Sequence, residues 1–222
     1  MQGYKGVIFD FDGVIVDSEY YWPLIENEYL IKNCKNWSNE LYDKLIGKSL
    51  PEVHEFIKTF GFRPSYKEYS DEYKKMGNLV YGKLCTINGP ILNLIYNLKS
   101  TDVKIAIASS TPKSIIKTVL HRLKVENYVF DDNIFTTDQT PKKLSKPNPE
   151  IYNFVIGKMH LTNNSFAVED SKSGVISAKK AGLTVVGIRN GYNQNQDIKK
   201  SDFVLNCLDE EFNQLFMGCY NG

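Results

Sequence analysis

The sequence has few cysteines and histidines, and those it has are not grouped. The cysteines lie far apart and form no CxxC pair (Cys34, Cys85, Cys207 and Cys219). This pattern is typical of reduced thiols and argues against a disulfide framework or a zinc site. The histidines are scattered as well (His54, His121 and His160). A histidine-based catalytic pair or metal cage is therefore not expected.

The sequence also lacks an excess of charge of one sign and a long apolar run. Its 27 basic and 26 acidic residues leave a net charge of +1, which gives no electrostatic footprint for nucleic acid. No apolar run is long enough to span a bilayer, and Met1–Lys5 holds no apolar core of a signal peptide. We therefore expect a cytoplasmic monomer with neither a membrane nor a nucleic acid as partner.

The most informative stretch begins with the apolar run Val7–Phe9, which is typical of a buried strand. Two carboxylates, Asp10 and Asp12, follow this run, and Gly13 comes directly after them. Buried carboxylates need a compensating charge, and a hard divalent cation with oxygen ligands supplies one. Gly13 allows a tight turn whose amides can face an anion.

Simpler interpretations of this stretch are an Asp-Gly turn between strands, a calcium loop or a pair of solvated acids. The calcium loop fails on its ligand pattern, because Ile15 stands where the glycine is needed and Tyr21 where the bidentate glutamate is needed. Solvated acids fit poorly beside so apolar a strand. The Asp-Gly turn stays open until the rest of the chain is considered.

The chain of 222 residues is long enough for one domain or for one domain with an insertion. Residues 17–87 show mostly helical periodicity, whereas a strand-to-helix loop normally takes about 2–6 residues. We therefore interpret 17–87 as a helical cap inserted into a core formed by 1–16 and 88–222. Its predicted helices cover 20–32, 40–46, 51–59 and 66–84.

From Ile91 onward, helical and strand patterns alternate, which predicts an α/β core with a Rossmann-like, doubly wound parallel sheet. The later strands are predicted at 103–108, 133–136, 165–168, 184–188 and 203–205. The cluster 190–196, rich in Asn, Gln and Gly, is interpreted as no more than a surface loop.

Ligands of such sheets lie beyond the carboxyl ends of the strands, so the residues there are candidates for chemistry. The candidates are Ser109-Ser110-Thr111-Pro112, Lys146 before Pro147, and Glu169-Asp170. Each has a simpler explanation when taken alone. Thr111 could cap a helix that starts at Pro112, Lys146 could be solvated, and the two acids could sit at a helix N-terminus.

Taken in order, Asp-x-Asp-Gly, Ser, Lys-Pro and Glu-Asp at strand ends resemble the four motifs of the haloacid-dehalogenase-like hydrolase superfamily. The resemblance is to the phosphatase and β-phosphoglucomutase branch, whose members carry a helical cap at the same insertion point. It covers the whole chain. Its most specific segments are residues 9–19 and 168–174.

The resemblance implies a phosphatase that hydrolyses small phosphomonoesters, such as sugar phosphates or phosphoglycolate, through an aspartyl phosphate. Asp10 would be the nucleophile and Asp12 the general acid and base. The Mg²⁺ ligands would be the carboxylates of Asp10 and Asp170 and the backbone carbonyl of Asp12, with Glu169 bound to the ion directly or through one water. The substrate-binding groups would be Phe11, Ser109, Ser110 and Lys146, with Gly47 and Lys48 in a cap loop.

Other activities remain as alternatives. A β-phosphoglucomutase-like mutase would have a histidine and an arginine where this chain has Trp22 and, approximately, Leu50. Dehalogenases of the superfamily lack the second aspartate, so Asp12 argues against them. A non-enzymatic phosphoacceptor switch would also use Asp, Mg²⁺ and Lys, but the Asp-x-Asp-Gly spacing and the cap favour an enzyme.

Overall fold

The computed structural model of the chain describes residues 4–45, 50–126, 131–162 and 164–206. The chain divides into two compact units. One is formed by Met1–Asp17 together with Thr86–Gly222, and the other by Ser18–Cys85. We call them the α/β unit and the helical unit.

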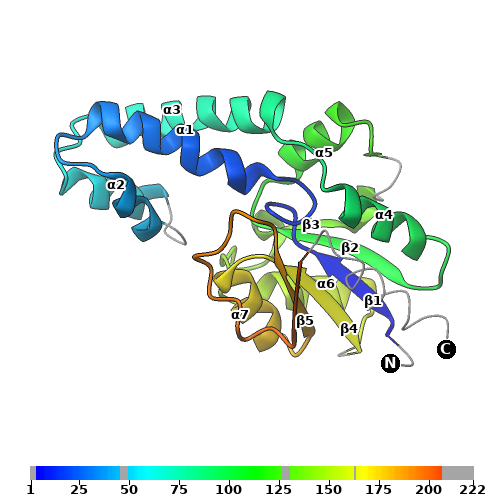
Figure 1. Cartoon of the computed structure of the whole chain (residues 1–222). Helices are drawn as coiled ribbons and strands as arrows, with labels where there is room; N and C mark the ends of the chain where they lie inside the picture. Colours follow the sequence, from blue (N-terminus) through cyan, green and yellow to red (C-terminus); the bar gives the residue numbers. More distant parts are fainter. Residues whose placement is uncertain (1–3, 46–49, 127–130, 163, 207–222) are drawn as a thin grey trace. The chain divides into compact units, whose positions relative to one another are not determined.

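The α/β unit is built on a six-stranded sheet with the order β3-β2-β1-β4-β5-β6, in which all neighbours are parallel (Figure 1). The strands are β1 (Gly6–Phe9), β2 (Lys104–Ser109), β3 (Ile134–Thr136), β4 (Ser165–Glu169), β5 (Thr184–Arg189) and β6 (Phe203–Asn206). The central strands β1 and β4 are buried along their whole length, as expected for strands covered on both faces. The predicted fold class, α/β with a doubly wound parallel sheet, is confirmed.

Helices cover both faces of this sheet (Figure 1). They are α4 (Gly89–Leu98), α5 (Lys113–Arg122), α6 (Glu150–Met159) and α7 (Lys172–Lys180), with short 3-10 helices at Asp131–Asn133 and Thr137–Gln139. Ile8 and Ala167 belong to the same core cluster as Tyr152 of α6 and Val175 of α7, so α6 and α7 share one face. Neighbouring side chains of a strand point to opposite faces, so the other face is left to α4 and α5.

The chain leaves and re-enters the α/β unit at Asp17 and Thr86, and these two residues are hydrogen-bonded to each other. The Thr86 backbone N–H donates to Asp17 Oδ1 at 2.5 Å, and its hydroxyl donates to Oδ2 at 2.8 Å. The Asp17 N–H donates to the Thr86 carbonyl at 3.2 Å. Val16 and Ile87 form an antiparallel bridge next to them.

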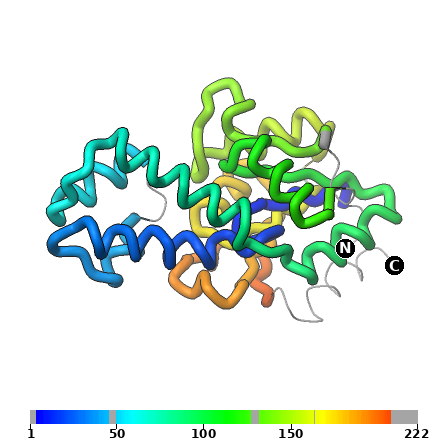
Figure 2. Tube along the Cα trace, turned by 90° about the horizontal axis from the view of Figure 1, so that it is seen from above, coloured from blue at the N-terminus to red at the C-terminus, as the bar shows by residue number. Residues whose placement is uncertain are grey.

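The described part of the helical unit contains the α-helices α1 (Ser18–Asn33), α2 (Leu50–Lys58) and α3 (Tyr66–Leu79). A 3-10 helix covers Asn39–Lys44, and a π-helix covers Val80–Leu84. The segment predicted as helical at 40–46 is thus a 3-10 helix as far as Lys44, and its last residue lies outside the described residues. The helix predicted at 66–84 is an α-helix as far as Leu79 and a π-helix after it. Figure 2 shows α1 and α3 running side by side. The core of the unit includes Leu30 of α1, Ile57 of α2 and Tyr69 of α3.

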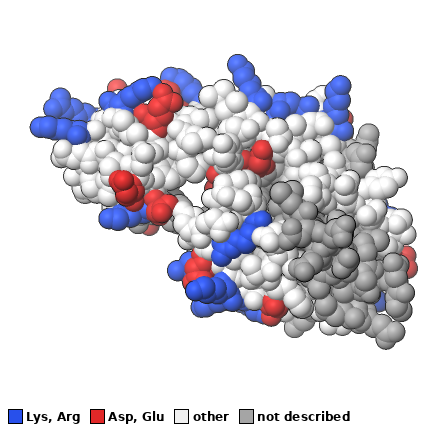
Figure 3. Space-filling view, in the orientation of Figure 1, with Lys and Arg blue, Asp and Glu red and all other residues white. Residues whose placement is uncertain are grey.

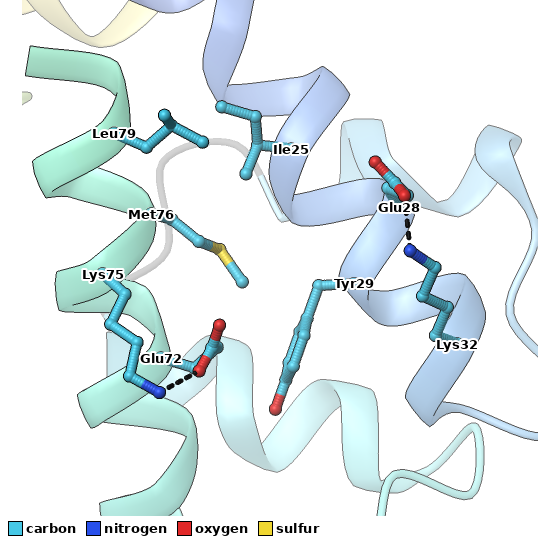
Figure 4. A pocket seen from close by; sticks show the side chains of 8 residues that line it. All are labelled: Ile25, Glu28, Tyr29, Lys32, Glu72, Lys75, Met76 and Leu79. Atoms are coloured by element: carbon cyan, nitrogen blue, oxygen red, sulfur yellow. Dashed lines mark hydrogen bonds and ion pairs between the residues drawn. The ribbon is translucent and has the colours of Figure 1, made fainter. Parts of the chain in front are cut away.

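A groove lies between α1 and α3 of the helical unit (Figure 4). Its apolar lining comes from Ile25, Tyr29, Met76 and Leu79. Its charged side chains form ion pairs within each helix, Glu28 with Lys32 and Glu72 with Lys75. Because these lysines already have carboxylate partners, the groove is a poor site for a phosphate group.

Basic and acidic side chains are interspersed on the face drawn in Figure 3. Among the described residues, no helix combines the length and the apolar character that crossing a membrane requires.

Glu26 is a buried acid in the core of the helical unit. It accepts hydrogen bonds from the hydroxyls of Tyr42, at 2.7 Å, and of Tyr69. Burial raises the pKa of the Glu26 carboxyl, although the two tyrosine hydrogen bonds oppose the shift. The folded unit therefore binds this proton more tightly than the unfolded chain. The resulting stability is complete below the unfolded pKa of about 4.3 and is lost as the pH rises through the folded pKa.

We predict that Glu26→Gln removes this loss of stability at higher pH. The melting temperature of the variant minus that of the wild type should become more positive as the pH rises from about 4 to 7. Circular dichroism melts measure it. Glu28→Gln on the same helix is the control, because Lys32 lowers the pKa of Glu28 and the difference should change with the opposite sign. A Glu26→Gln difference that does not vary with pH would contradict the prediction.

Candidate active site

The candidate site lies at the carboxyl ends of β1, β2 and β4. These ends are adjacent because β1 pairs in parallel with both of the other strands. Asp10 follows β1 directly, Ser109 is the last residue of β2, and Glu169 is the last residue of β4, with Asp170 next. The sheet topology thus brings together residues that are far apart in the sequence.

Three buried carboxylates form the centre of the site. Asp10, Glu169 and Asp170 each offer an oxygen atom, and these atoms lie within 4.8 Å of one another. Burial raises the pKa of Asp10 well above its usual range, and the nearby carboxylates of Glu169 and Asp12 add to the rise while Lys146 opposes it. Such a cluster needs positive charge, and carboxylate oxygens are the ligands that Mg²⁺ prefers.

Lys146 supplies part of that charge. Its ammonium lies 2.6 Å from Asp10 Oδ1, 2.6 Å from Glu169 Oε1 and 3.1 Å from the Ala108 carbonyl, and its side chain is only 8% exposed. Burial alone would lower the pKa of Lys146, but Asp10 and Glu169 outweigh it and hold the pKa well above its usual value. The simpler interpretation of Lys146 as a solvated lysine is therefore wrong.

Glu169 is held on two sides by residues of the neighbouring helices. The Tyr152 hydroxyl of α6 donates to Glu169 Oε1, the oxygen that also contacts Lys146. Glu169 Oε2 is buried and has no hydrogen-bond partner among the described residues. A side chain at Gly174, in the first turn of α7, would place its Cβ 1.9 Å from this oxygen. An unpaired buried carboxylate oxygen fits a site whose cation is supplied from outside the chain.

Asp12 is separate from the three-carboxylate cluster and is held by hydroxyl groups after β2. Thr111 Oγ1 donates to Asp12 Oδ2 at 2.7 Å, and Ser109 Oγ lies 3.5 Å from the same oxygen. The Thr111 amide also donates to Ser109 Oγ at 2.9 Å. Helix α5 begins at Lys113 without a side-chain cap, so Thr111 is not the helix cap that its sequence position suggests. Ser110 is exposed.

Asp170 is fixed from the loops that follow β1 and β5. Gly13 has φ of +74°, and a Cβ on it would lie 2.0 Å from Asp170 Oδ2, so only glycine fits here. The Asn190 amide donates to Asp170 Oδ2 at 3.0 Å and to the Gly13 carbonyl at 2.9 Å. Asn193 donates to the Asp170 carbonyl at 2.8 Å.

The remaining predicted site residues are less informative. The Phe11 side chain is fully buried, and its carbonyl accepts from the Ile15 and Val16 amides at 2.9 and 3.1 Å. Its backbone, not its ring, is therefore the part that could serve a ligand. Gly47 and Lys48 lie outside the described residues, so their predicted contact with substrate stays a prediction.

Residues 7–188 match the family described as haloacid dehalogenase-like hydrolase. The chain belongs to this family. The predicted membership is thus confirmed, and with it the prediction that the protein is an enzyme and a hydrolase.

Relatives of this haloacid dehalogenase-like hydrolase are named as phosphatases and as phosphomutases. The phosphorylated carbohydrates phosphatase of Thermotoga maritima is 30% identical over 213 residues, which is 93% of this chain and 95% of that protein. The beta-phosphoglucomutase of Bacillus subtilis is 29% identical over 227 residues, or 95% and 96% of the two chains. The crystal structure of beta-phosphoglucomutase from Clostridium difficile shares the fold with a TM-score of 0.71, at 24% identity and 99% coverage of both chains.

Several residues that shape the candidate site were given no role in it from the sequence: Thr111, Tyr152, Gly174, Asn190 and Asn193. The signal for Thr111 was that two further hydroxyl residues, Ser109 and Ser110, precede it, which a helix cap alone does not explain. Gly174 lies within the specific segment 168–174 but had no assigned role. The loop that holds Asn190 and Asn193 was interpreted as ordinary surface, and the structure contradicts this because Asn193 is only 4% exposed.

Gly174 and Gly157 both lie in helices, and together they give a matched test of how α7 packs against Glu169. We predict that Gly174→Ala destabilises the protein by about 1–3 kcal/mol, because the added methyl group overlaps the Glu169 carboxylate. Gly157→Ala in α6 should stabilise it by about 0.5–1 kcal/mol, because nothing lies within 4 Å of the added Cβ and alanine favours the helix. Urea unfolding measures both. Equal effects of the two substitutions would count against the described position of Glu169.

Proposed function

We propose that this hydrolase is a Mg²⁺-dependent phosphatase of small phosphomonoesters, with Asp10 as the nucleophile. The observation that carries the proposal is the Asp10 carboxylate, held 2.6 Å from the Lys146 ammonium and within 4.8 Å of two further buried carboxylates. Such a carboxylate is fixed in place and lies where cationic and polar groups can meet a phosphate.

Mg²⁺ would be held by the carboxylates of Asp10, Asp170 and Glu169, with the Asp12 carbonyl as a further ligand. Glu169 Oε1 already accepts from Lys146 and Tyr152, which leaves Oε2 as its atom for the ion. The bound ion would screen the repulsion between the Asp10 carboxylate and the phosphoryl oxygens.

Asp10 attacks the phosphorus atom, the bond to the leaving oxygen breaks, and an aspartyl phosphate forms on Asp10. Asp12 gives its proton to the leaving oxygen. It then takes a proton from the water that attacks the phosphorus and releases phosphate, which restores both carboxyl groups. The hydrogen bond that Thr111 donates to Asp12 Oδ2 supports this role, because it fixes the carboxyl group.

The phosphoryl oxygens would be bound by Lys146, the Ser109 hydroxyl, the Ser110 amide and the backbone near Phe11. The helical unit would act as a cap that excludes water and selects the substrate, with Gly47 and Lys48 in its loop. A small phosphorylated metabolite, a sugar phosphate or phosphoglycolate, would be the substrate. The phosphorylated-carbohydrate activity named for the Thermotoga maritima relative supports the sugar phosphate.

A sugar phosphomutase is the second candidate, because the Bacillus subtilis relative bears that name. Trp22 weakens it. This residue stands where the mutases have their histidine, and its ring stacks on Tyr73 with a centroid distance of 4.6 Å while its N–H donates to Tyr81 at 3.3 Å. An indole N–H can donate a hydrogen bond but cannot act as a base. Phosphate release without formation of an isomeric sugar phosphate would decide for the phosphatase.

We predict that Asp10→Asn lowers Mg²⁺-dependent phosphate release from p-nitrophenyl phosphate by at least about 10³-fold, because the amide cannot form the covalent intermediate. Asp197→Asn, at an exposed position of the α/β unit, is the control and should keep full activity. Circular dichroism checks that both variants fold. Substantial turnover by pure, folded Asp10→Asn would contradict the covalent route.

Asp12→Asn should slow both half-reactions, because asparagine can neither give nor take the proton. With an activated donor such as acetyl phosphate, rapid quench and intact-protein mass spectrometry should show phosphate accumulating on Asp10. If the variant turns over slowly and no phosphorylated protein builds up, Asp12 is not the base of the second step.

A further inference from the structure

Asn190 connects the two loops that carry the acidic residues of the site. One nitrogen of its side-chain amide donates to Asp170 Oδ2 at 3.0 Å and to the Gly13 carbonyl at 2.9 Å. An amide nitrogen has two hydrogens, so both bonds form at once. Gly13 belongs to the loop of Asp10 and Asp12, and Asp170 follows β4. Asn190 therefore ties together, from β5, the chain segments that follow β1 and β4.

The loop around Asn190 is itself held in place. Asn193 is buried, and its amide donates to the Asp170 carbonyl at 2.8 Å and to the Ile188 carbonyl at 2.9 Å. Its side-chain oxygen accepts from the Asn190 backbone N–H at 3.3 Å. Arg189 donates to the carbonyls of Asn193 and Gln196 at 2.8 and 2.9 Å. These hydrogen bonds hold the backbone around Asn190 in place.

We propose that Asn190 is a positioning residue for the Mg²⁺ site, which fixes the rotation of the Asp170 carboxylate toward Asp10. The Asn190 amide donates to Asp170 Oδ2 and so holds this oxygen toward the loop that follows β5. Groups that orient a metal ligand typically change metal affinity or activity by about 10–100-fold when they are removed. The role rests on the proposed function, since it requires that the acidic cluster binds Mg²⁺.

The test is Mg²⁺ binding to the full chain, measured by isothermal titration calorimetry without substrate. Asn190→Ala should raise the Kd for Mg²⁺ by about 10–100-fold, and the melting temperature in EDTA should stay close to that of the wild type. Its phosphatase activity should recover as Mg²⁺ is raised, which a general loss of folding would not produce. Gln194→Ala, an exposed position in the same loop, should behave as the wild type.

Wild-type Mg²⁺ affinity in Asn190→Ala would overturn the positioning role, and so would an affinity loss that appears only together with a lower melting temperature in EDTA. If Asn190→Ala does not fold, Asn190→Ser carries the same measurement, because its shorter side chain falls short of Asp170. A wild type that binds Mg²⁺ but hydrolyses no phosphomonoester would overturn the proposed function and leave the positioning role intact. A wild type that binds no Mg²⁺ would overturn both.

Discussion

The buried ion pairs of Lys146 with Asp10 and Glu169 are the interaction on which the site depends. Three carboxylates within 4.8 Å of one another repel in a medium from which water is excluded. The Lys146 ammonium offsets part of that repulsion, and its position over the Tyr152 ring, 5.2 Å from the centroid, adds a second stabilising contact. Breaking a buried pair by removing one partner costs about 3–5 kcal/mol, so Lys146 is important for the stability of this region apart from its proposed role in binding phosphate.

Two glycines allow the acidic residues to pack closely against the backbone. The carboxylates of Asp170 and Glu169 approach Gly13 and Gly174 so closely that a Cβ on either glycine would overlap a carboxylate oxygen. At these two points the acidic cluster therefore packs directly against the backbone. Within the described part of the chain, Lys146 supplies positive charge to the cluster, and neutral donors such as Tyr152 and Asn190 orient the acids.

The sheet and its flanking helices could be predicted because their signals are local. Apolar runs such as Val7–Phe9 and helical periodicity specify an element within a few residues, and the motif residues Asp10 and Asp170 follow such strands directly. The contacts of Thr111, Tyr152 and Asn190 could not be predicted, because each depends on a partner far away in sequence and on the register of the sheet. Each residue type is also common in helices or turns, so its local pattern is fully explained without a role in the site.

The junction at Asp17 and Thr86 affects how freely the segment inserted between them can change in length. Its three hydrogen bonds close the ends of the insertion within the α/β unit itself. Each doubling of the length of a closed loop adds only about 0.6 kcal/mol of entropic cost. The length of the inserted segment can therefore change at this junction, in evolution or by protein engineering. The ends of the insertion stay joined, and the order of the strands in the sheet is kept.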